Sequence, residues 1–202
     1  MRGTEAVHVV DDDDGVRDAL RLLLEAAGFT VTAYESAGRF LAAAPFAVGC
    51  LLTDVRMPGM DGLELQQRLR ELGARLPVIV MTGAADVPVA VRAMKTGAVD
   101  FLEKPVEEGV LLDAVQRALA AGRQQRDLAS AAADAAIRLT RLTPRERDVA
   151  DLLAAGLANK AIASKLGASP RTIEVHRARV LEKLEVGSLP ELVRLVLAAG
   201  GA

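Results

Sequence analysis

The sequence predicts a doubly wound α/β domain with a five-stranded parallel sheet, followed by a small all-α helix-turn-helix domain. In residues 1–122, five short apolar segments alternate with five segments whose apolar residues recur at helical spacing. This alternation is typical of a parallel sheet with helices on both faces. From residue 138 onward only helical patterns follow. We therefore expect domains at 1–122 and 138–202, joined by a helical linker at 123–137.

The composition indicates a globular protein from a reducing compartment. Hydrophobic residues make up 51% of the chain and charged residues 26%. The one cysteine, Cys50, lies inside an apolar run, which argues against a disulfide framework. No apolar run approaches the roughly 18 residues of a membrane span, and no signal peptide is recognisable at the start. We expect a soluble, cytoplasmic protein without a membrane partner.

Charge is distributed unevenly along the chain. Residues 1–122 contain 12 Lys and Arg against 18 Asp and Glu, whereas residues 138–202 contain 11 against 7. An acidic first part suits a bound cation, and a basic second part suits phosphate groups.

The elements of the first domain follow from apolar runs and from the Gly and Pro residues that end them. Expected strands are 7–10, 30–34, 48–52, 77–81 and 100–103. Expected helices are 16–27, 36–43, 62–72, 88–95 and one that begins near 106. Ser36 is the expected cap of the second helix.

Polar residues follow four of these strands directly. They are Asp11 with Asp12, then Asp54, Thr82 and Lys104. Because the carboxyl ends of parallel strands share one sheet edge, we expect these side chains to face one crevice. Carboxylates there can bind Mg²⁺, one can accept a phosphoryl group, and a hydroxyl and an ammonium can hold its oxygens. Each residue alone suits a capping or solvated role, so the prediction depends on their joint placement.

Four motifs in this domain resemble the receiver domains of two-component response regulators, over about residues 5–120. They are Val9-Val10-Asp11-Asp12, Leu52-Thr53-Asp54-Val55-Arg56-Met57-Pro58-Gly59-Met60-Asp61-Gly62, Val80-Met81-Thr82-Gly83 and Gly97-Ala98-Val99-Asp100-Phe101-Leu102-Glu103-Lys104-Pro105. The resemblance implies a CheY-like, flavodoxin-like fold.

The same resemblance implies a role for each matching residue. Asp54 would be the phosphoacceptor, and the ammonium group of Lys104 would bind the phosphoryl group. The Lys104–Pro105 peptide bond would be cis. Thr82 and Phe101 would form the switch pair. Asp11, Asp12, Asp54 and the backbone carbonyl of Arg56 would hold Mg²⁺. Asp13 and Asp14 leave open which acidic pair binds the metal, and the resemblance favours Asp11 and Asp12.

The linker is expected to continue the last helix of the first domain. Between 112 and 136 the sequence is rich in alanine, a strong helix former, and its only Gly or Pro is Gly122. The alternative is a helical linker that is interrupted at Gly122.

Helix-start signals divide the second domain. Thr143 with Glu146 and Ser188 with Glu191 form capping boxes, and Ser169-Pro170 opens a further helix. A three-residue turn, 167–169, joins two helices with helix-turn-helix spacing. On the second of these, Arg171, Val175, Ala178 and Arg179 face away from an apolar stripe, which suits the DNA major groove. A basic bundle that binds another protein is the alternative.

Three motifs resemble the LuxR-type helix-turn-helix over about 140–200, and the whole chain resembles the FixJ/NarL class, the FixJ subgroup in particular. They are Leu142-Thr143-Pro144-Arg145-Glu146-Arg147-Asp148-Val149, Gly156-Leu157-Ala158-Asn159-Lys160-Ala161-Ile162-Ala163 and Ser169-Pro170-Arg171-Thr172-Ile173-Glu174-Val175-His176-Arg177. The resemblance implies DNA contacts near the second helix and dimerisation through the final helix. The candidate contacts are Lys160, Arg171, Thr172, Glu174, Val175, Ala178, Arg179 and Lys183. At the position of Glu174 some members of the family have a basic residue, so the preference for particular DNA bases cannot be carried over to this chain. The two histidines, His8 and His176, are interpreted as structural.

These observations predict a transcription regulator and not an enzyme. The expected partners are a histidine kinase, double-stranded DNA, a second copy of the chain after phosphorylation, and RNA polymerase.

Two alternative functions remain. Asp12-Asp13-Asp14-Gly15 also suits a phosphatase of the haloacid dehalogenase type, although that leaves Asp54 and the second domain unexplained. A receiver that takes no phosphate and binds DNA constitutively is the other.

Overall fold

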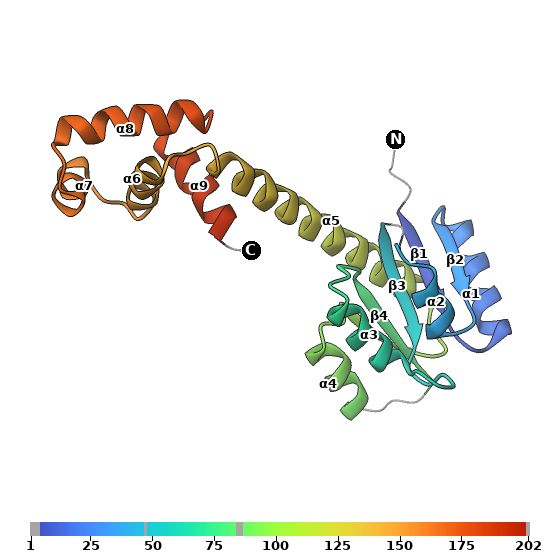
Figure 1. Ribbon diagram of the computed structural model, residues 1–202. Coiled ribbons are helices and arrows are strands. Elements are labelled where there is room, and N and C mark those ends of the chain that lie inside the picture. Colours follow the sequence, from blue (N-terminus) through green and yellow to red (C-terminus); the bar gives the residue numbers. More distant parts are fainter. Residues whose placement is uncertain (1–4, 47, 84–86, 201–202) are drawn as a thin grey trace. The chain divides into compact units, whose positions relative to one another are not determined.

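The computed structural model describes residues 5–46, 48–83 and 87–200, which form two compact units divided between Gln125 and Arg126 (Figure 1). Strands and helices alternate in the first unit. They are β1 Ala6–Val10, α1 Asp14–Ala26, β2 Thr30–Tyr34, α2 Ala37–Ala42, β3 Gly49–Asp54, α3 Gly62–Glu71, β4 Val78–Thr82, α4 Val87–Lys95 and β5 Asp100–Glu103. Helix α5, Glu108–Leu139, begins in the first unit and ends in the second.

The five strands form one parallel sheet in the order β2-β1-β3-β4-β5, so the predicted fold class is confirmed. Every residue of β1, β3 and β4 is buried, as expected for strands covered on both faces. Strands β3 and β4 end later than predicted, because Asp54 pairs with Met81 and Thr82 pairs with Glu103. Asp54 and Thr82 are therefore the last residues of strands and not the first residues of loops.

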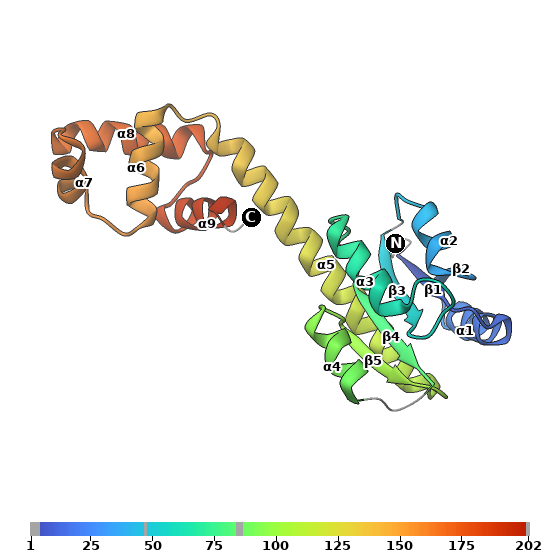
Figure 2. The same cartoon turned by 60° about the horizontal axis from the view of Figure 1, so that its bottom comes forward.

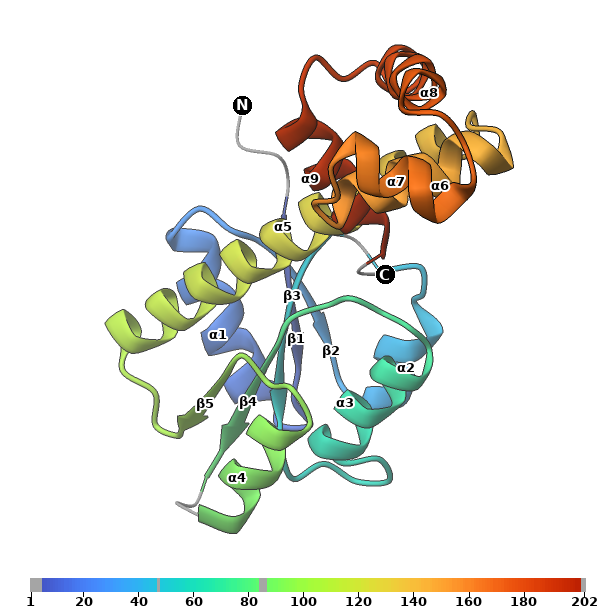
Figure 3. The same cartoon turned by 90° about the vertical axis from the view of Figure 1, so that its left-hand side faces the viewer.

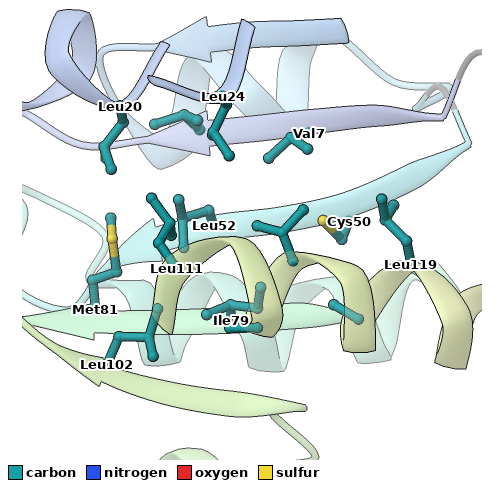
Figure 4. Close-up of a cluster of buried hydrophobic side chains, with 14 residues drawn as sticks. Val7, Leu20, Leu24, Cys50, Leu52, Ile79, Met81, Leu102, Leu111 and Leu119 are labelled. Atoms are coloured by element: carbon teal, nitrogen blue, oxygen red, sulfur yellow. The ribbon is translucent and has the colours of Figure 1, made fainter. Parts of the chain in front are cut away.

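Helices cover both faces of the sheet. Helix α1 and the first part of α5 lie on one face, and α2, α3 and α4 lie on the other (Figure 3). On the first face, Leu24 of α1 and Leu111 and Leu119 of α5 close over Leu52 and Ile79 of the sheet (Figure 4). His8 is buried and packs against the rings of Tyr34 and Phe40, in agreement with a structural role.

Helix α5 runs through Gly122 without interruption over 32 residues, so the alternative with a break at Gly122 is wrong. One glycine in a helix costs only about 1 kcal/mol relative to alanine, which the alanine-rich neighbours offset. Within the described residues no helix, α5 included, is apolar enough over a sufficient length to cross a bilayer.

The second unit packs the end of α5 with α6 Pro144–Ala154, α7 Asn159–Leu166, α8 Pro170–Lys183 and α9 Leu189–Gly200 (Figure 2). Thr143 and Glu146 form the predicted capping box at α6. At α9, the backbone N–H of Glu191 donates to Ser188 and its carboxylate accepts from Ser188 and Gly187. Buried apolar residues from all five helices make one core, which includes Leu139, Leu153, Ile173, Val180 and Leu192.

Candidate functional site

One lysine joins the carboxylates at the ends of two neighbouring strands. The Nζ of Lys104 donates to Oδ2 of Asp11 at 2.6 Å and to Oδ1 of Asp54 at 2.5 Å. Asp11 follows β1, Asp54 ends β3, and Lys104 follows β5, so the parallel sheet brings the three together from distant parts of the sequence. The side chains of Asp11 and Asp54 are 1% and 9% exposed. Two buried carboxylates thus share one ammonium group.

The loop after β3 holds Asp54 in place. The backbone N–H of Arg56 donates to Oδ2 of Asp54 at 2.6 Å, so both carboxylate oxygens have partners. Helix α3 begins close by: a Cβ on Gly62 would lie 2.1 Å from the carbonyl oxygen of Asp54. The N–H of Gly62 also donates to the carbonyl of Val55 at 2.9 Å. Only glycine permits this approach between the start of α3 and the end of β3.

The acidic run at 11–14 divides into residues with separate roles. Asp11 is buried, and its Oδ1 accepts from the N–H of Asp13 at 3.0 Å. Asp13 caps α1 by accepting from the N–H of Val16, and Asp14 forms an ion pair with Arg17. Asp12 is exposed. Local partners therefore occupy Asp13 and Asp14, which supports Asp11 and Asp12 as the acidic pair of the site.

The carboxylates raise the pKa of Lys104 above its ordinary value. Burial acts in the opposite direction, but the hydrogen bonds and charges of Asp11 and Asp54 outweigh it. Lys104 therefore remains a cation at neutral pH and neutralises part of the site's negative charge. The Lys104–Pro105 peptide is cis, which confirms the conformation that the resemblance implied.

The donor set suits a hard divalent cation with few protein ligands. Among the residues that the structure describes, no three His, Cys, Asp or Glu side chains form a ready-made metal cluster. Mg²⁺ does not need one, because it keeps several waters and is commonly bound through one or two carboxylates. Asp11 and Asp54 are such a pair, since their oxygens lie on the same ammonium nitrogen.

The predicted switch residues lie on the neighbouring strands β4 and β5. Thr82 ends β4 and is 3% exposed, and its carbonyl accepts from the N–H of Lys104 at 2.7 Å. Phe101 lies in β5, opposite Val80 of β4, and is partly buried against the core on the α2–α4 face of the sheet. A backbone hydrogen bond thus connects Thr82 to Lys104, and β5 connects Lys104 to Phe101.

The second unit contains the predicted helix-turn-helix. Helix α7 ends at Gly167 in the left-handed conformation with φ 62°, and Ser169 caps α8 by accepting from the N–H of Thr172 at 3.1 Å. One face of α8 is exposed, and so is Lys160 of α7. The exposed residues of α8 include Arg171, Thr172, Glu174, Val175, Ala178 and Arg179. Ile173 and Val180 on the opposite face are buried.

Lys183 differs from the other DNA candidates. Its Nζ donates to Oε2 of the buried Glu146 at 2.6 Å. This bond, together with hydrogen bonds from Thr143, lowers the pKa of Glu146 to about 2. The last turn of α8 faces α6, so Lys183 holds the capping box of α6 to α8 and its ammonium is engaged within the unit.

His176 is partly buried, and within the described residues its Nδ1 has no hydrogen-bond partner, so Nδ1 makes no backbone bond there.

Two contributors to the first site were missed at the level of sequence. Arg17 donates from Nη1 to the carbonyl of Asp11 at 2.6 Å, and Gly62 permits the close approach described above. Arg17 lies one helical turn into α1, and no feature of the sequence marks which way its side chain turns. The sequence places Gly62 in the motif after Asp54 and at the start of the helix at 62–72, but it does not show how closely the two backbones approach.

Comparison with known proteins identifies the chain. The family model described as the response regulator receiver domain matches residues 7–116. The chain belongs to the response regulators. In this response regulator, the model for bacterial regulatory proteins of the luxR family also matches residues 140–196. It therefore combines a receiver with a luxR-type DNA-binding domain and acts in two-component regulation of transcription. A receiver implies a histidine kinase as partner.

Full-length relatives share both domains of this response regulator. Transcriptional regulatory protein FixJ of Azorhizobium caulinodans is 52% identical, over 97% of this chain and 93% of the relative. The structure of response regulator StyR matches with a TM-score of 0.79 and 43% identity, over 96% of this chain and 98% of StyR. Full-length FixJ from B. japonicum matches with a TM-score of 0.61 and 47% identity, over 98% of each chain. The resemblance to the FixJ subgroup is confirmed.

Proposed function

We propose that this response regulator is switched by transfer of a phosphoryl group from a histidine kinase to Asp54. The observation that carries the proposal is the shared bond of Lys104 to Asp11 and Asp54 at one edge of the sheet. Asp11, Asp12, Asp54 and the Arg56 carbonyl would hold Mg²⁺. Residues 1–122 would act as the receiver, 123–137 as linker and 138–202 as the DNA-binding domain.

The chemistry needs a nucleophile and a partner for the incoming charge. An oxygen of Asp54 forms a bond to phosphorus while the bond between phosphorus and the kinase imidazole nitrogen breaks, and its electron pair returns to the imidazole. Bound Mg²⁺ would neutralise charge on the phosphoryl oxygens during transfer. Lys104 would exchange its bond to Asp54 for one to a phosphoryl oxygen. Thr82, at the neighbouring strand end, would bind another.

The phosphoryl group would then change the surface beside β5. A pull on Thr82 would reorient Phe101, which packs near α4. Helix α4 exposes Val87, Val91 and Met94, an apolar surface suited to a second copy of the chain. We propose that dimerisation through this surface of α4, and through the final helix α9 as the resemblance implies, precedes binding to promoter DNA and contact with RNA polymerase.

Intact mass tests the phosphoacceptor. After incubation with Mg²⁺ and acetyl phosphate, we expect one added phosphoryl group on the wild type and none on Asp54→Asn. Asp18→Asn, on an exposed carboxylate of α1, is the control and should label normally.

Labelling that survives in Asp54→Asn but disappears in Asp12→Asn would move the nucleophile to the acidic run and favour the phosphatase. Absence of label in the wild type would indicate a receiver that takes no phosphate. Continuous release of phosphate from simple monoesters would contradict a non-enzymatic role.

The exposed face of α8 is proposed to enter the major groove of DNA. We expect Arg179→Ala to weaken promoter binding by about 1–3 kcal/mol without loss of folding stability. Lys183→Met should instead lower the stability of the second unit, because the buried carboxylate of Glu146 would lose its ionic partner. Fluorescence anisotropy with promoter DNA and thermal unfolding separate the two effects. Equal losses of affinity in the two variants, with unchanged stability, would assign Lys183 to DNA after all.

A further inference from the structure

Helix α8 carries a carboxylate on the face that is proposed to enter DNA. Arg171 and Arg179 are exposed on this helix, and the exposed Glu174 lies between them in the sequence. Glu174 forms no hydrogen bond and no ion pair within the described residues, so its carboxylate is available to a donor outside the chain. The phosphates along a DNA duplex repel a carboxylate. A glutamate on this face therefore lowers affinity for DNA unless it accepts a hydrogen bond from a base.

The place of Glu174 in α8 suits contact with a base edge. Pro170 is the first residue of the helix, so Glu174 lies in the second turn, within the N-terminal half through which recognition helices meet bases. Val175 beside it and Ala178 one turn later are exposed and have short apolar side chains. Neither of these neighbours is large enough to hold α8 away from the bases, so the longer side chain of Glu174 can reach them.

The major groove offers a carboxylate two kinds of hydrogen-bond donor, the N4 amino group of cytosine and the N6 amino group of adenine. The adenine amino group lies between two acceptors, N7 of its own ring and O4 of the paired thymine, and both repel a carboxylate. The cytosine amino group has an acceptor on one side only, O6 of the paired guanine, and a C–H group on the other side. Guanine and thymine themselves present acceptors. Cytosine is therefore the base that suits a glutamate best.

We infer that Glu174 selects a cytosine in the DNA site of this response regulator. The N4 amino group of the cytosine donates to the carboxylate of Glu174. Repulsion from the acceptors of guanine and thymine adds to the selectivity, because specificity depends on the difference between the favoured and the disfavoured base. The inference rests on the proposed entry of α8 into the major groove, and it adds the base that one side chain reads.

Selection from a pool of duplexes with randomised base pairs identifies the preferred site of the full chain, treated with Mg²⁺ and acetyl phosphate. Fluorescence anisotropy then measures the affinity for this duplex and for its single-base variants. At one base pair we expect the wild type to prefer cytosine about tenfold. Glu174→Ala should lose this preference and keep the others. Glu174→Gln should prefer adenine there, because a glutamine amide pairs with N6 and N7 of adenine.

Glu182→Gln is the matched control. Glu182 is an exposed glutamate near the end of the same helix, so the change removes the same negative charge. It should raise the affinity for all duplexes to the same extent and leave the cytosine preference unchanged. In a further test, 2-pyrimidinone replaces the selected cytosine and removes its amino group. This replacement should weaken binding of the wild type about tenfold more than binding of Glu174→Ala.

An unchanged cytosine preference in Glu174→Ala would overturn the inference, and so would an equal response of the two proteins to 2-pyrimidinone. Arg179→Ala distinguishes this failure from failure of the proposed function. If α8 enters the groove but Glu174 reads no base, Arg179→Ala still weakens binding while Glu174→Ala changes no base preference. If α8 stays outside the groove, neither variant changes binding. The untreated chain, at higher concentration, should show the same cytosine preference, so the test does not depend on phosphorylation of Asp54.

Discussion

Lys104→Met is expected to destabilise the receiver by about 3 kcal/mol, because it leaves two buried carboxylates without their shared cation. Asp11 and Asp54 are 1% and 9% exposed at their side chains, so water cannot replace the ammonium group well. Urea unfolding followed by the fluorescence of Tyr34 measures the effect. Tyr34 is the only tyrosine in a chain without tryptophan and lies in the first unit, so its signal reports on the receiver.

Mg²⁺ provides a second readout for Lys104→Met. A cation that binds only the folded state stabilises it according to its affinity. With Lys104 gone, Asp11 and Asp54 present more uncompensated negative charge, so added Mg²⁺ should stabilise the variant more than the wild type. Lys95→Met, on an exposed lysine of α4, is the control and should change neither stability nor the response to Mg²⁺. A Lys104→Met protein as stable as the wild type would contradict the shared ion pair.

Gly62→Ala is expected to disturb Asp54 from outside the site. The new Cβ would lie 2.1 Å from the carbonyl oxygen of Asp54, and that atom belongs to the backbone of a fully buried strand. Either α3 or the end of β3 must shift. We expect a loss of stability of about 2–3 kcal/mol. The rate of phosphoryl labelling should fall about a hundredfold, since a displacement near 1 Å is enough for such a loss.

Gly38→Ala is the matched control for Gly62→Ala. Gly38 lies in helix α2, and a Cβ there would meet nothing within 4 Å. Alanine should stabilise the helix by about 0.5–1 kcal/mol and leave labelling unchanged. The time course of intact mass and the Tyr34 unfolding curve measure both variants. Wild-type labelling by Gly62→Ala would show that α3 can move without displacing Asp54.

Short-range patterns predicted the strands better than the ends of the elements. The apolar runs at 48–52 and 77–81 marked β3 and β4, but both strands extend further because their last residues pair with neighbours distant in sequence. The break considered at Gly122 was wrong for a related reason. A single glycine weakens a helix slightly, and whether the helix continues depends on its whole surroundings.

The sequence by itself determined the architecture and the group of residues that meet in the receiver. Apolar periodicity predicts the order of strands and helices along the chain. Because parallel strands place their carboxyl ends at one edge of the sheet, Asp11, Asp54, Thr82 and Lys104 are expected at that edge. Only the tertiary structure decided which side chains pair: Lys104 joins Asp11 to Asp54, and Lys183 holds Glu146. Those outcomes depend on side-chain directions and packing across distant segments, which periodicity along the chain does not encode.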